Sequence, residues 1–280
     1  MTVCADKTKF GGKTVSVNPK NQRKIVVVHG VQLGEDKDQN QHEVIRNLVK
    51  SRLGNIPLDF ATEMFLYENI NDDSQRLFSR VSSAIANTPV GGVITAKIID
   101  LIGDVVISLL DSSTAHQIRE ALKAQILDHY EKGNPCYLVA HSLGAIYAFD
   151  VLNELIREET YFHRNSRKSW PIQGLLTIGS PIGLDLFNVR RKQVAYLGEG
   201  NKWLRWYNYW DRTDPVVTGN IFGKQTAGYD IAELYQTGDK LQGWVIRDKI
   251  IDTGKVWLMS HVAYWDNPVV GDTLVEMITN

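Results

Sequence analysis

The stretch CYLVAHSLGAIYAF, residues 136–149, joins two apolar runs through a single serine. The first run, Cys136 to Ala140, is short and continuously apolar, which is typical of a strand buried on both faces of a parallel sheet. The second run has the length of a helix and extends from Ser142 to about residue 159. A strand that passes directly into a helix predicts an α/β protein.

Strands and helices alternate along the rest of the chain. Apolar or aromatic runs predict further strands at residues 24–30, 60–67, 174–178, 203–210 and 244–251. The run at 60–67 is the weakest of these predictions, because residues 61–67 also suit a helix. Helical spacing predicts helices at residues 41–53, over most of residues 72–132, and from residue 267 onward. This order predicts a mostly parallel central sheet flanked by helices, with a helical insertion before the strand at residues 136–140.

Length and composition indicate one domain. The 280 residues are 43% apolar and 22% charged, as in an ordinary soluble protein, and we expect one α/β domain over residues 24–280. Residues 1–23 carry scattered charges and lack the apolar segment of a secretory signal, so we expect a poorly ordered lead-in. Cys4 and Cys136, the two cysteines, are too few for a disulfide framework, which favours a reducing, cytoplasmic setting.

The position of Ser142 suits a nucleophile. A sharp turn between strand and helix exposes the central side chain, and it needs small neighbours such as Ala140 and Gly144. The start of the helix also directs unpaired N–H groups and the positive end of its dipole toward the hydroxyl. The alternative is a serine that only caps the helix, a role that serine favours in any α/β protein.

Residues 140–144 resemble the nucleophile elbow of the α/β-hydrolase superfamily, and more narrowly that of its lipase- and esterase-like members. The usual pattern is Gly-x-Ser-x-Gly, and Ala140 replaces its first glycine. Three more segments resemble these enzymes in the expected order: VVVHGVQ at 26–32, GSP at 179–181 and DPV at 214–216. The resemblance extends over about residues 24–280 and implies the α/β-hydrolase fold.

A serine nucleophile needs a histidine as its base, and in this fold the histidine comes last in the chain. Of the seven histidines, only His163 and His261 follow Ser142. His163 lies in a charged segment that suits a solvated loop. His261 lies after the last predicted strand and before the last helix, where the resemblance implies the catalytic histidine.

The acid is expected between the serine and the histidine, at the end of a late strand. Asp211 and Asp214 both follow the aromatic strand, and Asp248 and Asp252 rank lower because they lie in or beside the next one. The resemblance of Asp-Pro-Val favours Asp214, whose backbone the following proline also restricts. Asp211 then suits a turn, held by a side-chain hydrogen bond to nearby backbone.

The resemblance also implies the oxyanion donors, which are the backbone N–H groups of Leu143 and Val31. Gly30 allows the backbone to approach a substrate closely. Gly30 and His29 are both expected on the substrate side of the site. The main expected role of His29 is to support the loop. Residues 72–111 and 218–243 have the positions of lid or pocket elements in such enzymes, and plain packing explains them equally well.

No cofactor or metal is expected. The spacing of Asp36, Asp38 and Asn40 imitates a calcium loop, but Gln41 and Asn47 occupy positions that need glycine and glutamate. The 31 basic residues nearly balance the 32 acidic ones, which argues against nucleic acid as a partner. The apolar segment at residues 90–110 carries three charges, so membrane association is not favoured over a buried or amphipathic helix.

The sequence therefore predicts a serine hydrolase that cleaves a carboxylic ester, with a small-molecule or lipid ester as substrate. Ser142 would be the nucleophile, His261 the base and Asp214 the orienting acid. Thioester cleavage and acyl transfer would use the same residues. A noncatalytic scaffold of this fold that binds a partner or a small ligand is the alternative from another class.

Overall fold

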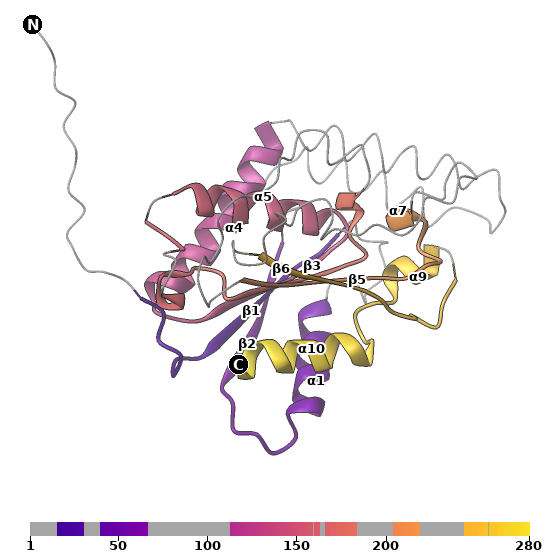
Figure 1. Cartoon of the computed structure of the whole chain (residues 1–280), viewed down its shortest axis with the longest axis horizontal. Coiled ribbons are helices and arrows are strands. Elements are labelled where there is room, and N and C mark those ends of the chain that lie inside the picture. The colour runs from indigo at the N-terminus through magenta and orange to yellow at the C-terminus, as the bar shows by residue number, and fades with distance from the viewer. Residues whose placement is uncertain are drawn as a thin grey trace, which may run out of the picture.

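The computed structural model describes most of the chain, and Figure 1 shows its arrangement. The residues described are 16–30, 40–66, 113–158, 160–162, 166–183, 204–218, 244–256 and 258–280. Several predicted features lie outside them: the range 72–111 expected as a lid or pocket element, all of 218–243 except Thr218, and two individual residues, Val31 and His163.

A six-stranded sheet forms the centre of the fold, in the order β2-β1-β3-β4-β5-β6. Every neighbouring pair is parallel, which confirms the predicted parallel sheet. The strands are β1 (Arg23–Val28), β2 (Phe60–Phe65), β3 (Cys136–His141), β4 (Gly174–Ile178), β5 (Leu204–Trp210) and β6 (Trp244–Ile250). They lie where the apolar runs predicted them, within a few residues at the ends.

Helices cover both faces of the sheet. Figure 1 shows α4 (Ser113–Glu131) and α5 (Leu143–Arg157) on one face, and α1 (Gln41–Leu53) and α10 (Pro268–Thr279) on the other. Shorter helical segments follow three of the strands or precede β4; they are η2 (Arg167–Ser169), η3 (Pro181–Gly183), α7 (Pro215–Thr218) and α9 (Leu258–Val262). Within the described residues, no helix is both long and apolar enough to cross a membrane.

Alternation along the central strands produces two hydrophobic cores. In β1, Val26 and Val28 pack into the core under α4 and α5, whereas Ile25 and Val27 pack into the core under α1 and α10. All four side chains are fully buried. A strand with both faces covered has to be apolar at every position, which explains the unbroken apolar runs of β1 and β3.

The ordered part of the chain begins earlier than residue 24. Val17 is buried, and its N–H donates to the carbonyl oxygen of Lys168 at 2.7 Å. The N–H of Asn18 donates to the carbonyl oxygen of Gly133 at 2.8 Å. The expected lead-in of residues 1–23 is therefore wrong for residues 16–23, because one apolar side chain and two backbone bonds hold this segment against the domain.

The parallel sheet places the carboxyl ends of all six strands at one edge. His29 follows β1, Ser142 follows β3, Gly179 follows β4 and Asp211 follows β5, and these residues directly succeed strands that run in the same direction. Segments far apart in sequence thereby meet at the carboxyl edge of the sheet, where open α/β sheets hold their ligands.

Candidate active site

Ser142 lies at a strained turn between β3 and α5. Its φ of 52° and ψ of −126° are outside the regions that an L-residue normally adopts. Such strain costs about 1–3 kcal/mol and persists only where the surrounding structure enforces it. Ser142 occupies the N-cap position of α5, yet its side chain makes no capping hydrogen bond. The helix-cap interpretation of this hydroxyl is therefore wrong.

Two glycines make the turn possible. A Cβ on Gly30 would lie 2.5 Å from Cβ of Ser142. A Cβ on Gly144 would lie 2.5 Å from the carbonyl oxygen of Val28 and nearer still to that of His29. The helix thus starts against the end of β1 at a distance that only glycine permits, and this contact holds the serine turn in place.

The hydroxyl of Ser142 belongs to a chain of three hydrogen-bonded side chains. Ser142 Oγ lies 2.9 Å from Nε2 of His261, and Nδ1 of His261 lies 2.8 Å from Oδ2 of Asp214. The carboxylate accepts, so Nδ1 carries the imidazole proton and Nε2 accepts the proton of the hydroxyl. The hydroxyl, imidazole and carboxylate come from three separate strand ends, as the fold's chain order requires.

The surroundings of Asp214 hold its carboxylate in one orientation. The side chain is fully buried. Oδ1 accepts the N–H of Val216 at 2.9 Å, and Oδ2 accepts both His261 and the hydroxyl of Tyr264, the latter at 2.7 Å. A buried carboxylate needs such partners, because an unpaired charge inside a protein is costly. Three donors therefore leave it no freedom to turn away from the imidazole.

Asp211 has a different role, although only two residues separate it from Asp214. Oδ1 accepts the N–H and the hydroxyl of Thr213, and Oδ2 accepts the N–H and the hydroxyl of Thr253, all at 2.7–2.8 Å. Burial alone would raise the pKa of Asp211, but these four hydrogen bonds outweigh it and hold the pKa below its usual range. Asp211 fastens the loop after β5 to the loop after β6.

His141 is a member of this cluster that the sequence reasoning missed. Its Nε2–H donates to the backbone carbonyl oxygen of His261 at 2.6 Å, and the two rings lie 4.7 Å apart between centroids. Burial, then the nearby His261, hold the pKa of His141 well below its ordinary value, so the ring stays neutral. Its only signal in the sequence is its place directly before Ser142 at the end of β3.

Tyr264 is a second residue without a sequence signal. Its hydroxyl donates to Asp214 and accepts the N–H of Asp211 at 2.9 Å, so it joins the two aspartates. Burial, then the charge of Asp214, raise its pKa well above the ordinary value and keep the proton on oxygen. Gly179, at φ +57°, makes room for this pair, since a Cβ there would lie 2.8 Å from the Tyr264 ring and 3.3 Å from Oδ2 of Asp214.

The expected oxyanion donors are described only in part. Leu143 is the first residue of α5, where backbone N–H groups lack partners within the helix. Val31 lies outside the described residues. His29 is fully buried, and its Nδ1 lies 2.6 Å from the carbonyl oxygen of Gly30. This burial favours support of the loop over direct contact with a substrate.

No family model matches the chain, and no curated protein matches it in sequence. Among solved structures, a putative hydrolase from Agrobacterium vitis is 13% identical with a TM-score of 0.43, over 94% of this chain and 90% of its own. A dienelactone hydrolase from Anabaena variabilis is 13% identical with a TM-score of 0.41, over 94% and 88%. A serine hydrolase homologue from Coxiella burnetii has the same identity and TM-score, over 92% and 87%.

Likenesses this distant add no weight to the assignment of the fold, which comes from the molecule itself. Six parallel strands, helices on both faces and a strained serine turn after a central strand constitute the α/β-hydrolase fold.

Proposed function

We propose that the protein is a serine hydrolase that cleaves a carboxylic ester through an acyl-enzyme. The observation that carries this proposal is the unbroken hydrogen-bonded chain from Ser142 through His261 to Asp214, with the hydroxyl at a strained turn. A structural serine needs neither the strain nor an imidazole hydrogen-bonded to a buried carboxylate behind it. An activated serine needs both.

In the first half of the reaction, Ser142 Oγ bonds to the ester carbonyl carbon while His261 Nε2 takes the hydroxyl proton. The carbonyl electron pair moves to its oxygen. When the pair returns, the bond to the alkoxy oxygen breaks, and His261 delivers its proton to the departing alcohol. The acyl group then remains on Ser142.

In the second half, water repeats the sequence. His261 takes a proton from water as the hydroxide adds to the acyl carbon, and it returns that proton to Ser142 Oγ as the acid leaves. Asp214 keeps its negative charge throughout, holds the imidazole in orientation and stabilises the imidazolium. The developing oxyanion would be bound by the N–H of Leu143 and by that of Val31.

An active-site probe tests the proposal. A fluorophosphonate should label the wild-type chain and leave Ser142→Ala unlabelled. Ser180→Ala is the matched control, because Ser180 is also a buried serine after a central strand, and within the described residues its hydroxyl only accepts a local hydrogen bond from the N–H of Ile182. Folded wild type that takes no label would contradict the hydrolase and favour a binding scaffold. Equal labelling of Ser142→Ala would contradict the assignment of Ser142 as the nucleophile.

A substrate panel then defines the reaction. Esters of increasing acyl length, matched thioesters and a competing alcohol acceptor separate ester cleavage from thioester cleavage and from acyl transfer by their products. The proposal predicts free acid and alcohol from the oxygen esters, with a burst of alcohol equal to the enzyme concentration if deacylation is the slower half. Turnover of thioesters alone would overturn the assignment to carboxylic esters.

A further inference from the structure

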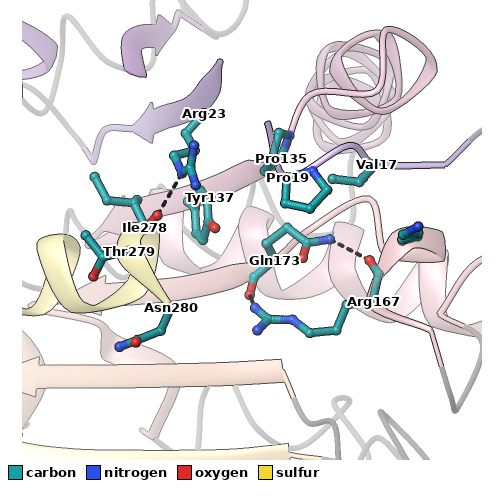
Figure 2. A pocket seen from close by; sticks show the side chains of 11 residues that line it. Val17, Pro19, Arg23, Pro135, Tyr137, Arg167, Gln173, Ile278, Thr279 and Asn280 are labelled. Carbon is teal, nitrogen blue, oxygen red and sulfur yellow. Dashed lines mark hydrogen bonds between the residues drawn. The ribbon is translucent and has the colours of Figure 1, made fainter. Parts of the chain in front are cut away.

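A second polar site lies at the opposite edge of the sheet. Here a cavity of about 280 Å³ opens between the start of β3, the segment before β4 and the end of α10. Figure 2 shows Arg23, Tyr137, Arg167 and Gln173 around it. Tyr137 precedes Ser142 by five residues along an extended strand, so the cavity lies roughly 16 Å from the serine and is separate from that site.

The cavity gathers positive charge without neutralising it. Arg23, Arg167 and Lys168 line it. In the described part of the chain, no carboxylate lies within 4 Å of these three cationic groups. The guanidinium groups use neutral acceptors instead, since Nε of Arg23 donates to the carbonyl oxygen of Ile278 at 2.8 Å and Nη2 of Arg167 donates to that of Gln173 at 3.2 Å. These bonds, drawn in Figure 2, orient both guanidinium groups, and most of their other N–H groups make no hydrogen bond within the described residues.

Arg167 is the group that most needs a ligand. Its Nε is buried and has no hydrogen-bond partner among the described residues. Burial, opposed by Tyr137 but reinforced by the charge of Arg205, lowers the pKa of Arg167. A half-buried cation with a buried, unpartnered donor atom is costly, and an anion in the cavity would reduce that cost.

Tyr137 lies close to several of these cationic groups. Its side chain is buried, and burial raises its pKa, while the charges of Arg167, Arg23 and Arg205 act in the opposite direction. Three guanidinium groups are therefore close enough to affect one phenol. Arg205 differs from the other two because Glu276 lies 3.7 Å from it. Arg23 and Arg167 remain for a ligand.

We propose that this cavity binds a phosphate group, either free or carried by a small molecule. Planar guanidinium forks match the oxygens of phosphate, and an ammonium group adds a point charge. Two guanidinium groups and one ammonium group match the two negative charges of a phosphate dianion better than the single charge of a carboxylate. The volume is close to the lower end for small-molecule sites, so it also accommodates an organic portion beyond the phosphate. The proposal does not depend on the hydrolase activity.

Calorimetric titration and thermal unfolding with defined anions test this site. Inorganic phosphate, glycerol 3-phosphate and acetate are each compared with sodium chloride at equal ionic strength, on the whole chain. We expect saturable binding of phosphate and a rise in melting temperature that chloride does not produce. Tighter binding of glycerol 3-phosphate than of phosphate would identify a phosphorylated small molecule, and equal or weaker binding would identify free phosphate.

The variants locate the site. Arg167→Gln should weaken phosphate binding at least about tenfold, because it removes a charge-assisted donor pair. Lys168→Gln should weaken it less, and since Lys168 is exposed this variant remains folded even if Arg167→Gln does not. Lys50→Gln removes an exposed charge at the end of α1, away from the cavity residues, and should leave binding unchanged. Absence of saturable phosphate binding, acetate binding as tight as phosphate, or equal losses in all variants would overturn the proposal.

Discussion

Replacing Tyr264 with phenylalanine removes one oxygen atom and two hydrogen bonds. The hydroxyl donates to Oδ2 of Asp214 at 2.7 Å and accepts the N–H of Asp211 at 2.9 Å, and the side chain is fully buried. A hydrogen bond to a charged group contributes about 1.5–3 kcal/mol, and an orphaned buried N–H costs about 1–3 kcal/mol. Tyr264→Phe should therefore lower the free energy of unfolding by about 2.5–6 kcal/mol.

The same change should affect catalysis if the proposed function is right. With one donor fewer, Asp214 is held less firmly against His261, and we expect kcat/KM to fall about tenfold, the equivalent of about 1.4 kcal/mol in the barrier. A carboxylate that has lost a donor also stabilises the imidazolium more strongly. The acid limb of the pH–rate profile should consequently move to higher pH, which a purely structural role would not cause.

Tyr209→Phe is the control. Tyr209 is equally buried, and its hydroxyl shares a 2.6 Å hydrogen bond with Thr273. Tyr209→Phe should lower the free energy of unfolding, measured in urea, by about 1 kcal/mol and should keep the wild-type pH–rate profile. The reasoning about Tyr264 is refuted if Tyr264→Phe loses stability while its kcat/KM and its acid limb stay those of the wild type.

Three further variants address other parts of the site. Asp214→Asn should reduce kcat by a factor on the order of 10⁴, the scale known for the acid of a serine protease triad, whereas Asp211→Asn should chiefly lower stability. Equal kinetic losses in steady-state assays would contradict the assignment of the acid. Gly144→Ala should destabilise the fold by about 3 kcal/mol or more, because the added Cβ meets fixed carbonyl oxygens. Its control is Gly254→Ala, where φ is +67° and the added Cβ meets nothing within 4 Å among the described residues, so the cost should be only about 1 kcal/mol. Similar unfolding midpoints of the two variants in denaturant would refute the close contact at Gly144. His141 has its pKa depressed by burial, so only the unfolded chain takes up its proton below about pH 6.5, and unfolding should become easier by up to about 1.4 kcal/mol per pH unit on acidification. In His141→Gln this dependence should weaken, and an unchanged slope of unfolding free energy between pH 7 and pH 5 would show that the ring is not buried neutral.

Most of the sheet was predictable from local pattern. Residues 25–28 of β1 and 136–140 of β3 are apolar runs because both faces of these strands are covered, and glycine follows α1 directly, so these three elements can be predicted without tertiary information. The weakest of these predictions, the strand at residues 60–67, is confirmed as β2, although its residues are only half-buried and also suit a helix. Its pairing with β1 decided between the two.

Sequence pattern could not predict the supporting residues of the candidate site. Tyr264 and His141 contact Asp214 and His261 through single atoms, and neither the spacing nor the type of these residues distinguishes them from ordinary core aromatics. The Gly-Ser-Pro turn was visible, but its purpose was not. Gly179 is required because the Tyr264 ring and the Asp214 carboxylate occupy the space that a side chain would fill.

By itself, the sequence determined the alternation of strands and helices, the sharp turn at Ser142, and a short set of residues able to serve as base and acid. These properties follow from burial and backbone restriction, which act between near neighbours in the chain. Only the tertiary structure shows which of Asp211 and Asp214 lies against the histidine. Both follow β5, but one carboxylate turns to threonines on two loops and the other to the imidazole of His261. That choice depends on the direction of a side chain relative to groups about forty to fifty residues away, and no local pattern records such a direction.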